Sequence, residues 1–174
     1  MIRFSAGWFA ALGIVVLAGC TRTPAPEAEE SSAGGSVSSA SSAADVEAIR
    51  AADSAWFQAY NRHDADAVAA LYADDAVLSM PGVPPVRGRA AVRDALQRDI
   101  EATARGGYTF KEGANGEIGA SGDLGWTWNS FTVTDSSGKT IDVGKFVSVL
   151  ARRDGKWLII HDIWNSDSPS TPAT

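Results

Sequence analysis

The sequence is poor in the side chains that usually carry redox, metal or nucleophilic chemistry. It holds one cysteine and two histidines among 174 residues, so an internal disulfide is impossible. A zinc site would need carboxylate ligands that no spacing indicates. No glycine-rich phosphate loop, dinucleotide-binding fingerprint or Gly-x-Ser-x-Gly turn occurs. We therefore expect neither a cofactor nor a bound metal.

Positive charge is also scarce. The chain has 15 Lys and Arg against 21 Asp and Glu, a net charge of -6, and no basic cluster offsets this balance. An acidic chain repels the phosphates of nucleic acid. The composition thus argues against a nucleic-acid partner.

The only cysteine, Cys20, ends an uncharged apolar stretch over residues 6–19 that follows Arg3. This stretch is shorter than the roughly 20 residues of a membrane-spanning helix, and it is typical of a secretory signal. It closes with Leu17-Ala18-Gly19-Cys20, which resembles the lipobox of bacterial lipoproteins. The resemblance implies a signal peptide over 1–19 and lipidation of Cys20. Because Thr21 rather than Asp follows, it also implies a cell-envelope protein anchored in the outer membrane and facing the periplasm. A plain secretory signal is the alternative.

The segment after Cys20 lacks the side chains that build a core. Between residues 21 and 44, Val37 is the only apolar side chain larger than Ala, and such a segment cannot bury enough surface to offset the entropy lost on ordering. We predict the lipidated cysteine and a disordered tether over 20–44, a folded domain over 45–168, and a flexible tail over 169–174.

Within the domain, helical spacing gives way to alternation. Helices are predicted from Asp45 to residue 60, from Asp64 to about residue 74, and from residue 89 to Gly106. Strands are predicted over 76–80, 108–111, 116–120, 125–134, 140–152 and 156–164, and short turns such as Asp154-Gly155 make the later ones antiparallel. This is an α+β plan, with three N-terminal helices packed on a curved, mostly antiparallel sheet.

The last predicted strand is apolar on both faces. Simple alternation puts Trp157, Ile159 and Ile163 on one side and Leu158, Ile160 and Trp164 on the other. Both faces of the sheet then need cover. The helices can cover one face, and we expect a second copy of the chain to cover the other, which gives a homodimer through the sheet. The alternative is that these side chains stay half exposed.

Several segments, in order, resemble the nuclear transport factor 2-like superfamily. They are IRAADSAW from residue 49, NRHDAD from 61, LYADDAV from 71, Pro81-Gly82, Gly88-Arg89 and GKWLIIHDIWN from 155. The match is to the SnoaL-like and calcium-calmodulin-dependent kinase association-domain-like bacterial branch. It implies a cone-shaped barrel with a deep apolar pocket between the helices and the concave sheet. Members include isomerases, cyclases, hydrolases, dehydratases, ligand carriers and dimerisation modules, so the fold does not fix the reaction.

The implied pocket provides candidate site residues. We predict that its lining includes Trp56, Tyr60, Tyr72, Met80, Trp126, Trp128 and Trp164. His161 and Asp162 are the candidates for acid or base chemistry, but neighbours in a strand point to opposite faces, so only one of them faces the pocket. Tyr60 is a candidate donor to a developing oxyanion.

One position departs from the steroid-isomerase-like members of the superfamily. Met80 stands where they carry an acidic general base before a Pro-Gly-like turn, and a thioether cannot accept a proton. A ketosteroid-isomerase mechanism is therefore not expected. Three functions stay open: a binding module for a small apolar or amphipathic molecule, a cofactor-independent acid/base enzyme of the isomerase, cyclase, dehydratase or hydrolase type, and a non-catalytic dimerisation module whose pocket is filled.

Overall fold

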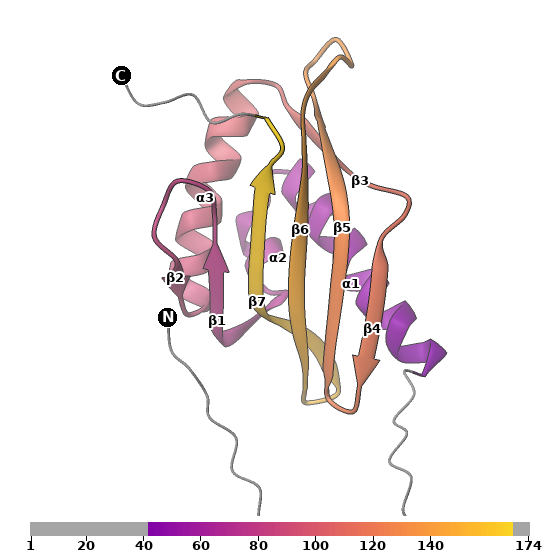
Figure 1. Ribbon diagram of the computed structural model, residues 1–174. Coiled ribbons are helices and arrows are strands. Elements are labelled where there is room, and N and C mark those ends of the chain that lie inside the picture. The colour runs from indigo at the N-terminus through magenta and orange to yellow at the C-terminus, as the bar shows by residue number, and fades with distance from the viewer. Residues whose placement is uncertain (1–41, 169–174) are drawn as a thin grey trace, which may run out of the picture. The chain divides into compact units, whose positions relative to one another are not determined.

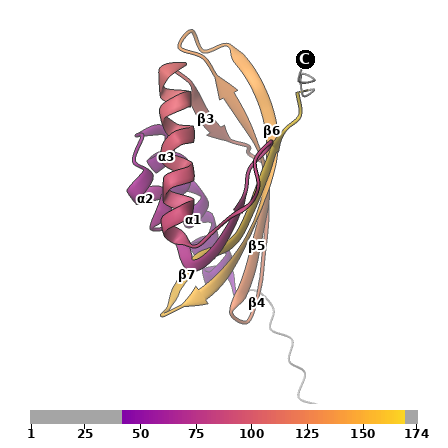
Figure 2. The same cartoon turned by 90° about the vertical axis from the view of Figure 1, so that its left-hand side faces the viewer.

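The computed structural model describes residues 42–168. The predicted signal peptide, Cys20, nearly all of the predicted tether and the tail 169–174 lie outside the described residues. Three helices lie against one face of a seven-stranded sheet (Figure 1). The sheet curves so that its concave face is turned toward α1 and α3 (Figure 2). The predicted α+β plan is confirmed. Within 42–168, no helix combines the length and the apolar character needed to cross a membrane.

The helices begin and end where local chemistry dictates. Helix α1 (Ala43–Asn61) begins at Ser42, whose Oγ accepts a hydrogen bond from the Asp45 backbone N–H, so the cap lies three residues before the predicted one. Helix α2 (Ala65–Ala69) begins at Asp64 as predicted, because its Oδ1 accepts from the backbone N–H of Ala67. Helix α3 (Arg89–Arg105) ends at Gly106, also as predicted.

The end of α2 differs from the prediction. The helix stops at Ala69, and strand β1 (Tyr72–Ser79) begins at Tyr72 rather than at residue 76. The cause is pairing with a distant strand, since Tyr72 lies opposite Ile159 in a parallel ladder. Asp74 and Asp75 are therefore exposed strand residues instead of helix-end residues.

Six further strands complete the sheet, and all but the first of them follow the predicted pattern closely. They are β2 (Val86–Arg87), β3 (Thr109–Glu112), β4 (Glu117–Ser121), β5 (Leu124–Thr134), β6 (Thr140–Arg153) and β7 (Lys156–Ser166). Their order is β2-β1-β7-β6-β5-β3, with β4 also on β5, and every pairing except β1 with β7 is antiparallel. Asp154 and Gly155 form the predicted tight turn, with φ values of 51° and 76°. The two-residue β2 was not predicted.

Strand β7 contains an extra residue. Leu150 of β6 pairs with Ile159, and the next residue of β6, Val149, pairs with His161, so Ile160 has no opposite partner. A β-bulge of this kind shifts the alternation by one position. The face of every later residue in β7 is set by this bulge.

The bulge corrects the predicted faces of β7. Asp162 and Trp164 share the helix-facing side with Ile159, whereas Ile163 lies on the other side and is 55% exposed. Simple alternation had put Ile163 with Ile159, and that prediction is wrong.

The two faces of the sheet have different surroundings. The concave face packs against the helices around a buried apolar core that includes Ile49, Leu96 and Leu150. The outer face carries large apolar side chains that are more than a third exposed: Leu124, Trp126, Trp128, Ile141, Val143, Val147 and Ile163. Trp128, Val147 and Ile163 form one continuous row across β5, β6 and β7.

Candidate functional site

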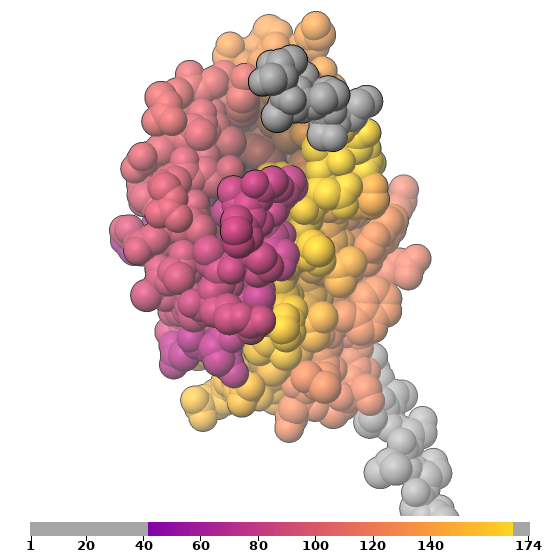
Figure 3. All heavy atoms as spheres, turned by 60° about the vertical axis from the view of Figure 1, so that its left-hand side comes forward, coloured from indigo at the N-terminus to yellow at the C-terminus, as the bar shows by residue number. Residues whose placement is uncertain are grey.

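A pocket opens between α1, α3 and the concave face of the sheet. Its cavity volume is about 40 Å³, and about 560 Å³ of space is free of atoms when the open mouth is counted. The surface is hollowed between α3 and the last residues of β7 (Figure 3). The cavity itself is narrow, so a bound molecule would extend into the mouth.

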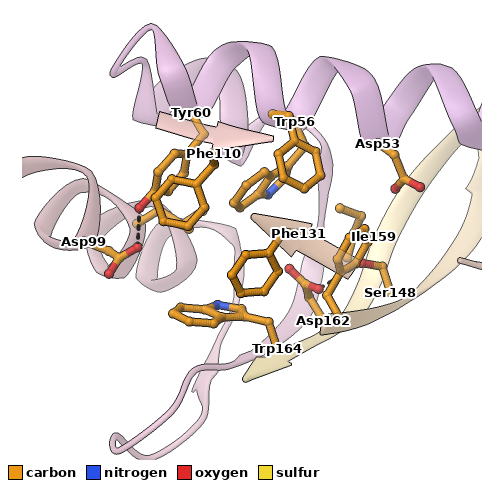
Figure 4. A pocket seen from close by; sticks show the side chains of 13 residues that line it. Asp53, Trp56, Tyr60, Asp99, Phe110, Phe131, Ser148, Ile159, Asp162 and Trp164 are labelled. Carbon is orange, nitrogen blue, oxygen red and sulfur yellow. Dashed lines mark hydrogen bonds between the residues drawn. The ribbon is translucent and has the colours of Figure 1, made fainter. Parts of the chain in front are cut away.

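Aromatic rings form most of the pocket wall. Seven of the 13 lining residues are aromatic: Trp56, Phe57, Tyr60, Phe110, Phe131, Phe146 and Trp164 (Figure 4). Trp56 and Tyr60 lie one turn apart on α1 and stack, with ring centroids 4.9 Å apart. Phe110 of β3 meets Tyr60 edge to face at 4.8 Å. The rings pack against one another, so the wall that they present to the cavity is apolar and well supported.

Asp162 reaches the pocket wall from β7 and is held by hydroxyl groups. The Tyr72 hydroxyl donates to Asp162 Oδ2 at 2.6 Å, and the Ser148 hydroxyl donates to Oδ1 at 2.8 Å. The indole N–H of Trp56 donates in turn to the Tyr72 oxygen at 3.0 Å. Burial raises the pKa of Asp162, and the two hydroxyl donors oppose that rise. Both of its oxygens are thus occupied.

Asp53 enters the pocket from α1 and is only 4% exposed. The Thr127 hydroxyl of β5 donates to Asp53 Oδ2 at 2.7 Å, and no other hydrogen bond to this carboxylate occurs among residues 42–168. Burial raises the pKa of Asp53 to about 7, Thr127 opposes the rise, and the nearby charges of Glu112 and Asp162 add to it. A buried carboxylate that titrates near neutral pH suits acid or base chemistry.

Asp99 is the third carboxylate of the pocket and lies on α3. The Tyr60 hydroxyl donates to Asp99 Oδ2 at 2.5 Å and also contacts the Thr103 hydroxyl at 3.3 Å. Burial and the neighbouring carboxylate of Asp99 raise the pKa of Tyr60 above its ordinary value. Tyr60 therefore stays neutral, with its proton directed at Asp99.

The structure divides the predicted site residues into three groups. Trp56, Tyr60, Asp162 and Trp164 line the pocket. Tyr72 lies fully buried behind Asp162, and Met80 is half-buried against the core without reaching the pocket. The third group lies on the outer face and consists of Trp126, Trp128 and His161. Of the two adjacent acid/base candidates, the pocket therefore receives Asp162.

Two pocket carboxylates were missed in the sequence. Asp53 lies four residues from both Ile49 and Phe57, so it falls on the apolar stripe of α1. A carboxylate on the buried stripe of a helix was the sequence signal that could have identified it. Asp99 follows Leu96 by three residues on α3 and carries a similar signal. In the described part of the chain, no group of three or more His, Cys, Asp or Glu side chains is arranged to hold a metal ion.

This fold and its pocket are those of a cone-shaped α+β domain of the nuclear transport factor 2-like kind. Residues 54–160 match the SnoaL-like domain family, and the chain belongs to that family. No curated protein matches the chain.

Solved structures share the fold. The chain is similar to an NTF2-like protein of unknown function from Pseudomonas putida, with 23% identity over 71% of this chain and 87% of that one and a TM-score of 0.65. It is also similar to a protein with a cystatin-like fold from Nostoc punctiforme, with 18% identity over 75% and 96% and a TM-score of 0.64. A ketosteroid isomerase-like protein from Erwinia carotovora atroseptica is 25% identical over 72% and 98%, with a TM-score of 0.57.

Proposed function

We propose that the domain binds a small, mostly apolar molecule in the pocket beneath α1 and α3. One observation carries this proposal. Asp53 is 4% exposed, lines a pocket walled by aromatic rings, and has one oxygen without a hydrogen-bond partner among the described residues. Among residues 42–168 the only fully buried side-chain polar atom without a partner is Trp157 Nε1, so the second Asp53 oxygen is accessible from the pocket. An accessible, unpaired carboxylate oxygen in an apolar pocket fits a ligand site better than a filled interior.

The tryptophans allow a direct test of binding. Trp56 and Trp164 line the pocket, whereas Trp126 and Trp128 lie on the outer face. We expect benzyl alcohol, added to the full chain, to shift the indole N–H resonances of the first pair in an NMR titration. The resonances of the second pair should stay in place and serve as an internal control.

A pair of matched variants locates the binding. Ile159 lines the pocket and is 2% exposed, while Ile163 lies four residues later in β7 on the outer face. Ile159→Phe should fill the pocket and weaken benzyl alcohol binding, and Ile163→Phe should leave it unchanged. Equal binding by both variants would contradict the proposal.

Acid/base catalysis in the same pocket is the second candidate function. It is supported by the raised pKa of Asp53, about 7, because a carboxylate titrating near neutral pH can both accept and return a proton. The 25% identity to a ketosteroid isomerase-like protein adds support. Asp53 would act as the base, with Asp162 held beside it by Tyr72 and Ser148.

Proton exchange at carbon tests this candidate without a known substrate. In D₂O, a base takes a proton from the carbon next to the carbonyl of phenylacetone and solvent deuterium replaces it. We expect the full chain to accelerate this exchange, Asp53→Asn to lose the acceleration, and Asp94→Asn, which changes an exposed carboxylate of α3, to keep it. Exchange at the rate of buffer alone would contradict the acid/base proposal and leave the binding proposal standing.

We also propose the setting in which the pocket works. The lipobox ending at Cys20 supports a lipid anchor in the outer membrane, with residues 21–44 as a tether that leaves the domain in the periplasm. The exposed apolar row of Trp128, Val147 and Ile163 supports a homodimer joined through the outer face of the sheet.

A further inference from the structure

We propose that the pocket selects a molecule whose apolar body carries a positively charged nitrogen, in preference to neutral or acidic molecules of the same size. This inference rests on the proposed binding function and adds the charge of the ligand. Of the 13 lining residues, three are aspartates and none is Lys, Arg or His.

The three carboxylates surround the cavity from different elements. Asp53 comes from α1, Asp99 from α3 and Asp162 from β7 (Figure 4). Their negative charges therefore act on the same enclosed space from several sides. In such a low-dielectric site, a cation is favoured and a second anion is opposed more strongly than in water.

The protein does not supply cations of its own to these carboxylates. Their side-chain hydrogen-bond donors are the hydroxyls of Thr127, Tyr60, Tyr72 and Ser148. By contrast, exposed aspartates on the same domain pair with arginine, as Asp66 does with Arg93 at 2.8 Å. The pocket carboxylates are thus held in place by neutral hydroxyl groups, with no cationic side chain hydrogen-bonded to them among the described residues.

Asp53 shows the clearest need for a cation. One of its oxygens has no partner in the described range, and the side chain is more than nine-tenths buried. Three charged groups shift the pKa of Asp53: the carboxylates of Glu112 on β3 and Asp162 on β7 raise it, and Arg50 on α1 lowers it. The Arg50 side chain is 52% exposed and pairs with Glu47, so it does not fill the pocket.

Aromatic faces supply the second half of the recognition. Trp56 and Tyr60 present stacked rings on α1 within the same pocket wall. A nitrogen cation gains from ring faces through cation–π attraction and from a carboxylate through a charge-assisted hydrogen bond. A pocket that offers both to one ligand favours an alkylamine or an arylalkylamine, whose nitrogen is protonated near neutral pH.

Three probes of one size separate the effect of charge from that of shape. At about pH 8, benzylamine is cationic, benzyl alcohol is neutral and benzoate is anionic. We expect the full chain, followed through the indole N–H resonances of Trp56 and Trp164, to bind benzylamine at least about tenfold more tightly than benzyl alcohol, and benzoate most weakly. Asp53→Asn and, independently, Asp99→Asn should each reduce this ratio, whereas the exposed Asp94→Asn should preserve it.

The outcomes distinguish this inference from the binding function beneath it. If benzyl alcohol or benzoate binds as tightly as benzylamine, the charge preference is overturned and the apolar pocket stands. If none of the three probes shifts either resonance, both proposals are overturned. A ratio that neither pocket variant changes would also overturn the inference, because the preference would then come from charges elsewhere on the molecule.

Discussion

The hydroxyl of Tyr72 donates a 2.6 Å hydrogen bond to Asp162, a residue 90 positions later in the chain. The same hydroxyl accepts from the Trp56 indole, so it joins β7 to α1 through β1. Tyr72 is fully buried and Asp162 is 7% exposed. Asp162 is therefore both a pocket residue and part of the scaffold that positions the helices on the sheet.

Removing this hydroxyl should cost stability. Tyr72→Phe leaves a buried carboxylate oxygen and a half-buried indole N–H without this partner, and we expect a loss of about 1–3 kcal/mol in the free energy of unfolding. Urea denaturation measures it. Tyr108→Phe, at a tyrosine that is 39% exposed, is the matched control, and similar losses in the two variants would contradict the assigned role of the hydroxyl.

The carboxylate of Asp53 should make stability depend on pH. Its pKa is about 7 in the folded chain and about 3.8 ordinarily, so between these values the folded state keeps a proton that the unfolded chain has lost. This contribution to stability is full below about pH 4 and falls by up to about 1.4 kcal/mol per pH unit until it levels off above pH 7.

The Asp53→Asn variant isolates that contribution. Asparagine does not titrate, yet its amide oxygen can still accept from Thr127. We expect the variant to gain stability relative to the wild type as the pH rises from about 5 to 8, measured by denaturation at each pH. For Asp94→Asn the same difference should stay flat. The stability of Asp53→Asn minus that of the wild type could instead stay constant or fall as the pH rises. Either result would show that the pKa of the Asp53 carboxyl is not raised.

The start of α2 depends on the Asp64 side chain. Asp64→Ala removes the hydrogen bond that its carboxylate accepts from the Ala67 N–H, and we expect a loss of about 1 kcal/mol in unfolding free energy. Asp64→Asn keeps a capping oxygen and should lose little. Equal losses for the two substitutions would assign the effect to charge instead of capping.

A charge on the outer sheet face should abolish the proposed homodimer. Ile163→Asp places a carboxylate in the row with Trp128 and Val147, where burial against a second copy would leave it unpaired. Analytical ultracentrifugation should then find a monomer. Val83→Asp, at a residue that is 50% exposed in the loop after β1, should keep the dimer. A wild-type chain that sediments as a monomer would end this proposal.

The proposed lipid anchor depends on a single thiol. Cys20→Ala removes the acceptor of the diacylglycerol group, and we expect the protein to move from the detergent-rich to the aqueous phase in a Triton X-114 partition of cell extracts. Metabolic labelling with palmitate should likewise be lost. Partition of the wild type into the aqueous phase would contradict the anchor.

Much of the fold was predictable because its signals are local. The Asp64 cap, the glycine stop of α3 and the Asp154-Gly155 turn each depend on a few neighbouring residues. The start of β1 was missed because Tyr72 joins the sheet through Ile159, a contact that local helix preference does not reveal. Pairing between distant strands decided that boundary.

The site was predictable only in part, for a related reason. The aromatic residues of α1 and the adjacent His161 and Asp162 could be chosen from the sequence, but the face that each strand residue takes depends on registers that are set elsewhere. Trp126 and Trp128 illustrate this. Exposed and buried residues alternate along β5 as expected, but both tryptophans are on the exposed side, away from the helices. Asp53 was missed because helix position alone does not reveal which buried carboxylate has open space beside it.

The bulge at Ile160 means that the face a β7 residue takes cannot be counted from its position in the sequence alone. If Ile160 paired with Val149 instead of bulging, His161, and not Asp162, would lie opposite Ser148 on the pocket face. When SnoaL-like sequences are aligned, a gap misplaced by one column in the last strand therefore exchanges an imidazole for a carboxylate at the pocket wall. Transfer of functional residues between relatives of this domain should begin by locating the bulge.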